Sequence, residues 1–198
     1  MRHLGVPYRS QWAGLGCNAA VVGGADPCTT GPWWETGFTD ADAYRFWSGK
    51  VCGLACLESA LDHWRRSRPD RAALLGEALE YGVYVRRDDG GVDGLIYAPF
   101  LRWIVARFGI AGEVHTETSL RDLASTVGPR SFAIASVSPG IRWPDRPNER
   151  RGGHLVLITG RDGDRVWFHN PSGFEANSTL PLDVMDRFFA GRGMTISR

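Results

Sequence analysis

A cysteine and a glycine stand where the first clear helical pattern of the sequence begins. Leu54, Leu57 and Leu61 recur at spacings of three and four residues, which predicts an amphipathic helix that starts near Cys52. A thiol at the start of a helix faces free backbone N–H groups and the positive end of the helix dipole, and both stabilise the thiolate. Gly53 would leave the backbone uncovered, so that a substrate carbonyl could approach and the N–H of Cys52 could meet its developing oxyanion. Cys52 is therefore a candidate nucleophile; the alternative is a buried structural cysteine.

A histidine opens an apolar run in the second half of the chain. Residues 154–160 have the composition of a buried strand, and two glycines precede His154. Gly153 leaves space in front of the imidazole, which a histidine packed in a core rarely has. His154 is therefore a candidate base for a thiol on a facing helix, and Gly153 is a candidate contact of the substrate.

An asparagine follows the next predicted strand, which covers residues 165–169. If the two strands form a hairpin around residues 162–164, their far ends lie at the same level and Asn170 becomes a neighbour of His154. The side chain of Asn170 could then accept a hydrogen bond from the imidazole and hold its tautomer and orientation. His169 should point to the opposite face of the strand. The alternative is that Asn170 and the proline after it only form a turn.

The remaining patterns place helices early in the chain and strands late. Helices are predicted over residues 70–81, 97–108, 120–127 and 181–189, and strands over residues 131–138, 154–160, 165–169 and 194–197. Gly191 and Gly193 are predicted to end the last helix. This order indicates an α+β fold in a single domain over residues 1–198, with any active site where the two halves meet.

Two segments have no regular pattern. Residues 12–50 carry many glycines, prolines and tryptophans, and we interpret them as an irregular insertion anchored by aromatic packing. Within it, Trp47 is a candidate to line a substrate groove next to Cys52. Residues 139–153, an arginine-rich loop just before His154, are interpreted as solvated surface; the alternative is a lid or a clamp for a substrate carboxylate.

Composition and charge exclude several function classes. The chain has 198 residues, 43% of them hydrophobic, which is long and apolar enough to build a core without a disulfide or a metal. The net charge of +1, from 23 basic and 22 acidic residues, gives no reason to expect nucleic acid or an anionic membrane as partner. No apolar stretch could span a bilayer and no signal peptide is visible, so we expect a cytoplasmic protein and a monomer.

The four cysteines form no recognisable framework. Cys17, Cys28, Cys52 and Cys56 are too few for a disulfide scaffold, and their spacings match no common zinc pattern. Cys56 lies one helical turn beyond Cys52 and is interpreted as core packing, with a resolving thiol as the alternative. We expect no metal and no cofactor.

Four segments of the chain together resemble the C39-like family of papain-fold cysteine peptidases. They are Val6-Pro-Tyr-Arg-Ser-Gln11, Cys52-Gly-Leu-Ala-Cys-Leu, Gly-Gly-His154-Leu-Val-Leu-Ile-Thr-Gly and His-Asn170-Pro, in the family's order. The resemblance implies a papain-like fold in which Cys52 is the nucleophile, His154 the base and then the acid, and Asn170 the residue that orients the imidazole. It also implies that Gln11 donates into the oxyanion hole. The best-known members of the family are cytoplasmic and trim leader peptides after a Gly-Gly pair.

Two features depart from the family's pattern. Gln11 stands 41 positions before Cys52, whereas relatives have the glutamine a few residues before the nucleophile, so Gln11 must fold back across the insertion to act. Asn170 stands where the family more often has an aspartate, so the ion pair of the imidazole with a carboxylate is absent. An asparagine still suffices in papain-like enzymes.

These residues predict a cysteine peptidase or amidase that forms a thioester on Cys52. Its substrate would be a peptide, or a small amide or ester, and the resemblance suggests maturation of a peptide. One alternative transfers the acyl group to an amine, as an acyltransferase or amide-forming enzyme of natural-product biosynthesis. The sequence does not separate the two, because the difference lies in which nucleophile reaches the thioester first. A second alternative is a noncatalytic papain-like binding module.

Overall fold

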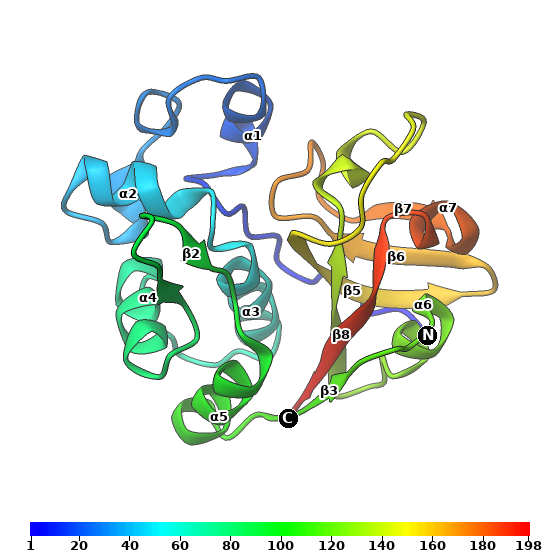
Figure 1. The fold of residues 1–198 in the computed structure, drawn as a ribbon. Coiled ribbons are helices and arrows are strands. Elements are labelled where there is room, and N and C mark those ends of the chain that lie inside the picture. The colour runs from blue at the N-terminus through cyan, green and yellow to red at the C-terminus, as the bar shows by residue number, and fades with distance from the viewer.

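A helical half and an antiparallel sheet lie side by side in the computed structural model, which describes residues 1–198 (Figure 1). The helices of the first half are α1 (Leu15–Val22), α2 (Ala41–Ser48), α3 (Cys52–His63), α4 (Arg71–Glu80) and α5 (Tyr97–Phe108). Short connections between them are the 3₁₀ turns η1 (Pro27–Thr29) and η2 (Trp33–Thr36) and a ribbon of β1 (Val85–Arg86) and β2 (Val92–Asp93).

The sheet has six strands in the order β3-β8-β4-β5-β6-β7, and every neighbouring pair is antiparallel. The strands are β3 (Ala111–His115), β4 (Ser131–Val137), β5 (His154–Asp162), β6 (Arg165–His169), β7 (Ser178–Pro181) and β8 (Phe189–Ser197). Three short helices belong to this half: α6 (Leu120–Ser125), η3 (Pro139–Arg142) and α7 (Leu182–Asp186).

Two apolar clusters cover the two faces of the sheet. Leu155 and Leu157 of β5 pack with Leu54 and the rest of the larger cluster, which holds α3 and α5. Val156 and Ile158 pack on the other face, in the cluster that holds α6 and α7. Successive side chains of a strand point to opposite faces, so a strand covered on both sides is apolar throughout. This explains the continuous hydrophobic run after His154 and puts α3 directly against β5.

The predicted α+β class is confirmed, as are the elements with strong local signals. The helix predicted to start near Cys52 is α3, and the one predicted over residues 97–108 is α5, with the same bounds. α4 is one residue shorter at each end than predicted; at its N-terminal end the Asp70 side chain accepts the N–H of Ala73 and caps the helix. The predicted hairpin is also present, with Asp162 paired to Arg165 across its turn.

The prediction for the C-terminal segment is wrong. α7 is shorter than predicted, and Pro181 is the last residue of β7, a strand that the sequence does not predict. β8 already starts at residue 189, so Gly191 and Gly193 lie inside a strand instead of ending a helix. Gly193 is needed there because a Cβ would lie 2.5 Å from a backbone carbonyl oxygen of β4.

Residues 12–50 contain regular structure that their sequence does not predict. α1 and α2 both lie in this segment, and α2 buries Tyr44 and Trp47. Trp33 stacks on Tyr44 with 5.7 Å between ring centroids, and Phe38 packs edge-on against the same ring at 5.6 Å. Aromatic side chains therefore anchor the segment, as predicted, but it is less irregular than expected.

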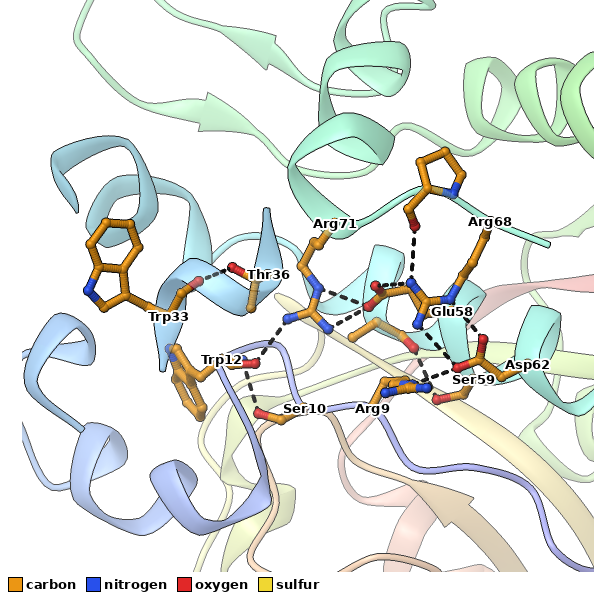
Figure 2. A network of polar contacts seen from close by, with 12 residues as sticks. Arg9, Ser10, Trp12, Trp33, Thr36, Glu58, Ser59, Asp62, Arg68 and Arg71 are labelled. Atoms are coloured by element: carbon orange, nitrogen blue, oxygen red, sulfur yellow. Dashed lines mark hydrogen bonds and ion pairs between the residues drawn. The ribbon is translucent and has the colours of Figure 1, made fainter. Parts of the chain in front are cut away.

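A buried ion network ties the N-terminal segment to α3 and α4 (Figure 2). Glu58 of α3 is 2% exposed and accepts hydrogen bonds from Arg71 Nε at 2.8 Å and Arg68 Nη1 at 2.9 Å. Arg71 also donates from Nη1 to the carbonyl oxygen of Trp12 at 3.0 Å. Because Trp12 follows Gln11, this network fixes the backbone beside Gln11.

Replacing Glu58 by Gln should destabilise the protein by about 3 kcal/mol, because Arg71 then keeps a buried charge without a carboxylate partner. Arg9→Gln is the matched control. Arg9 pairs with Asp62 at 2.6 Å, but its side chain is 44% exposed, so its loss should change the free energy of unfolding by less than about 1 kcal/mol. Urea unfolding at neutral pH measures both variants, and equal effects would contradict a structural role of the buried pair.

Candidate active site

Cys52 is the first residue of α3, and its backbone surroundings favour a negative charge on the sulfur. The backbone N–H groups of Leu155, Gly53 and Cys52 itself lie against the sulfur and lower its pKa, as does the more distant guanidinium of Arg142. Burial has the larger, opposite effect and raises the pKa of the Cys52 thiol above its ordinary value. Burial therefore outweighs the stabilisation of the thiolate by the start of the helix in the unliganded protein.

His154 opens β5, and its imidazole is held by Asn170. Nε2 lies 2.8 Å from Asn170 Oδ1, which also accepts the backbone N–H of Ser172 at 3.1 Å. That second donor identifies the oxygen of the amide, so His154 donates from Nε2 and its Nδ1 is the free base nitrogen. The pairing of Leu157 with His169 brings Asn170 alongside the first residues of β5.

The charge state of His154 follows from its surroundings. Burial lowers the pKa of His154 to about 4, the hydrogen bond to Asn170 opposes this, and the positive charge of Arg142 adds to it. At neutral pH the site therefore holds a neutral imidazole beside a neutral thiol, with no carboxylate in contact with either.

Ser172 and Arg142 also belong to the site; Ser172 is not among the predicted residues, and Arg142 lies in the loop interpreted as surface, with a lid or clamp as the alternative. The Ser172 hydroxyl is fully buried, lies 3.1 Å from His154 Nε2, and accepts hydrogen bonds from Arg142 Nη2 at 2.6 Å and Nε at 2.9 Å. The other acceptors of Arg142 are the carbonyl oxygens of Ser172 and Pro139. No local sequence pattern links residues 142 and 172. The number of arginines in the loop before His154 is the one feature of the sequence that could have pointed to Arg142.

Cys52 and His154 line one cavity of about 760 Å³ between the two halves. Leu95, Tyr97 and Ser136 contribute to its walls. No hydrogen bond joins the thiol to the imidazole, and both open onto the same space. In unliganded enzymes such contacts are often long and shorten when substrate binds.

The two glycines predicted to contact substrate differ in their surroundings. Gly153 lines the cavity with φ +92°, and a Cβ there would meet only Pro139 Cδ, at 3.9 Å. The space in front of His154 is thus open, as the sequence suggests. At Gly53, however, a Cβ would lie 2.2 Å from Leu95 Cδ1. Leu95 fills the space that was predicted to admit a substrate carbonyl, so Gly53 makes room for the packing of Leu95 against α3.

Gln11 folds back as far as Ser48, four residues before Cys52, but it is not among the residues that line the cavity of Cys52 and His154. Its backbone N–H donates to the Pro171 carbonyl oxygen at 2.9 Å, and its Nε2 donates to the Ser48 carbonyl oxygen at 3.2 Å. The Ser48 carbonyl fixes the orientation of the amide, because the opposite orientation would place two oxygens together. The side chain is 3% exposed and its Oε1 has no donor. Gln11 thus lies between residues that precede Cys52 and residues that follow Asn170.

Trp47 does not line the cavity, contrary to its predicted place in a substrate groove. It is 3% exposed and packs edge-on against Phe46 at 5.2 Å and Tyr84 at 5.9 Å between ring centroids. Its position on the buried face of α2 places it in the core.

The other three cysteines are free thiols. Cys17 donates to the Thr30 carbonyl oxygen at 3.1 Å, Cys28 to that of Ala41 at 3.3 Å, and Cys56 to that of Leu155 at 3.8 Å. Burial raises the pKa of Cys56 well above its ordinary value. The structure contains no cluster of three His, Cys, Asp or Glu side chains placed to hold a metal ion. None of its helices combines the length and apolar character needed to span a membrane.

No family model and no curated protein matches the sequence, but solved structures match the fold. The peptidase domain of Streptococcus ComA, a bi-functional ABC transporter involved in a quorum-sensing pathway, superposes with a TM-score of 0.52 at 13% identity, over 75% of this chain and 91% of that one. A chain described as a C39-like peptidase from Bacillus anthracis gives a TM-score of 0.56 at 12% identity, over 75% and 89% of the two chains. The protein has the fold of a C39 peptidase domain.

The C39 fold confirms the papain-like architecture predicted from the four short segments. At 12–13% identity the likeness concerns the fold. The activity therefore has to be argued from the side chains around Cys52.

Replacing Arg142 by Gln should raise the pKa values of both His154 and Cys52, because the guanidinium charge lowers both. Arg142→Lys keeps the charge but loses the forked contact with Ser172, so it should preserve most of the shift. NMR titration of His154 and the pH dependence of Cys52 alkylation by iodoacetamide measure the two groups. A wild-type His154 that is protonated at pH 7, as in a thiolate–imidazolium pair, would contradict the neutral site.

Proposed function

We propose that this protein is a cysteine peptidase or amidase that cleaves a peptide or amide bond through a thioester on Cys52. The observation that carries the proposal is the 2.8 Å contact between His154 and Asn170 at the cavity that Cys52 also lines. The C39 peptidase fold supports the proposal, because the similarity of fold points to a peptidase independently of these contacts.

Acylation begins from a neutral thiol and a neutral imidazole. As the sulfur of Cys52 attacks the substrate carbonyl carbon, its proton moves to His154 Nδ1, while Nε2–H keeps its hydrogen bond to Asn170. The imidazolium then gives this proton to the leaving amine, the C–N bond breaks, and the thioester remains. Water attacks the thioester with His154 as base, which releases the acid and restores the thiol.

The developing oxyanion needs donors that are in place before the reaction. We assign this role to the N–H of Cys52, at the start of α3, and to Nε2 of Gln11. The contact of Nε2 with the Ser48 carbonyl uses one of its two hydrogens and leaves the other without a protein acceptor. Gln11 stands 41 positions before Cys52 in the chain, but its side chain contacts Ser48, which stands only four positions before Cys52.

Cys52→Ala and His154→Ala should each lower the rate of amide cleavage by roughly 10⁴-fold or more. Mass spectrometry with an activated ester should find one acyl group on Cys52 in the wild type, and product analysis with and without added amines separates hydrolysis from transfer. Cys56→Ala is the matched control, one turn away on the same helix, and should acylate normally. Slow iodoacetamide alkylation of Cys52 near pH 6 that is the same in His154→Ala, together with no acylation, would favour a noncatalytic binding module.

Gln11→Ala should lower kcat by roughly 10²- to 10³-fold, the usual effect of removing one oxyanion donor, and should leave the alkylation rate of Cys52 almost unchanged. Steady-state kinetics, iodoacetamide alkylation and urea unfolding are measured on the same preparation. If Gln11 only joins the two halves, the variant loses stability while kcat stays within a few-fold of wild type.

A further inference from the structure

The cavity around Cys52 is positively charged. Lys50 and Arg192 line it together with His154, and no aspartate or glutamate is among its lining residues. Neither cation takes part in any ion pair of the structure. By contrast, the arginines of the ion network around Glu58 are all paired with carboxylates. A concave site lined by one sign of charge concentrates the opposite charge from solution.

Lys50 is held at the cavity wall on the side of the nucleophile. It is the only lysine of the chain and stands two positions before Cys52. Its Nζ donates to the Phe46 carbonyl oxygen and lies 3.9 Å from the centroid of the Phe46 ring. The side chain is half-buried, and burial lowers its pKa. These contacts fix the ammonium group but supply no negative charge.

Arg192 of β8 lies beside Gly152, the first of the two glycines that precede His154. A Cβ on Gly152 would be 3.8 Å from Arg192 Nη2, so the guanidinium borders the open approach to the imidazole. The side chain is exposed, and its one polar protein contact in the cavity is the Tyr97 hydroxyl, whose pKa it lowers, which occupies only part of the five N–H donors of a guanidinium. The remaining donors are available to a ligand in the cavity, where the forked geometry of a guanidinium suits a carboxylate.

We infer that the substrate carries a carboxylate close to the bond that is cleaved, and that Lys50 and Arg192 bind it. The inference rests on the proposed function for the presence of a scissile bond, but the carboxylate site itself does not require catalysis. The carboxylate can come from an aspartate or glutamate side chain or from the free C-terminus of a short peptide. Both sources present the same group to the two cations.

Binding to the Cys52→Ala variant tests the inference without turnover. Two pairs of peptides serve as probes. The first pair consists of amidated octapeptides with a central Gly-Gly, in which one flanking residue is either Glu or Gln. The second pair consists of Gln peptides that end two residues after Gly-Gly, with either a free or an amidated C-terminus. Isothermal calorimetry should show tighter binding of the charged member of at least one pair, by about two- to five-fold for each cation engaged. The pair that responds identifies the source of the carboxylate.

The single variants Lys50→Gln and Arg192→Gln should each reduce the preference for the charged peptide. The double variant should abolish it. Arg165→Gln is the control with the same change of charge, because Arg165 lies at the turn of the β5–β6 hairpin, the end opposite His154. Equal binding of all matched pairs, a preference that survives the double variant, or no binding of any charged peptide would overturn the inference.

Turnover by the wild type separates this inference from the proposed function. Cleavage without any charge preference leaves the peptidase intact and removes the carboxylate site. A charge preference in binding, combined with no cleavage and no acylation of Cys52, leaves the carboxylate site and removes the peptidase.

Discussion

The packing of α3 against β5 is the constraint on which the site depends. Leu54 and Leu155 belong to one buried cluster, and the Cys56 thiol donates to the Leu155 carbonyl oxygen at 3.8 Å. Cys52 and His154 are the first residues of these two elements, so the relative position of thiol and imidazole is set by the packed core and by no flexible connection. Sites carried by rigid elements are held more accurately than sites on loops.

The absence of a carboxylate beside His154 has consequences for the whole site. Burial lowers the pKa of His154 to about 4 and the hydrogen bond to Asn170 only partly opposes this, so the imidazole is neutral at neutral pH. An aspartate at position 170 would stabilise the imidazolium, but it would also lie next to the Ser172 hydroxyl that Arg142 contacts and would attract that guanidinium. A neutral amide leaves the charge of Arg142 free to lower the pKa of the thiol. Asn170 and Arg142 are thus compatible with each other: the amide holds the neutral imidazole, and the guanidinium keeps its effect on the thiol.

The sequence predicts those parts of the site that depend on local patterns. The start of α3, the apolar run after His154 and the two-residue turn of the β5–β6 hairpin each leave a periodic or turn signal, and they bring His154 to Asn170. Features that depend on distant parts of the chain leave no such local signal in the sequence. Gly53 and Gly193 are glycines because Leu95 and a strand of the sheet approach them, and Ser172 joins the site only because Arg142 reaches it from another loop. The sequence does not predict the edge strand β3, because its mostly exposed side chains carry no alternating apolar and polar pattern.

The segment between Gln11 and Cys52 can be long because its ends are held independently of its length. The entropy of closing a loop grows only slowly with the number of residues, so contacts at the ends decide where Gln11 lies. Its N–H binds the Pro171 carbonyl beside Asn170, its amide binds the Ser48 carbonyl ahead of Cys52, and Arg71 holds the next residue, Trp12, through the network of Glu58. The N-terminal segment therefore joins the sheet half to the helical half at the level of the nucleophile. Burying Gln11 Oε1 without a hydrogen-bond donor costs about 1–3 kcal/mol. The NH2 group of the same amide is the one proposed to bind the oxyanion of the substrate.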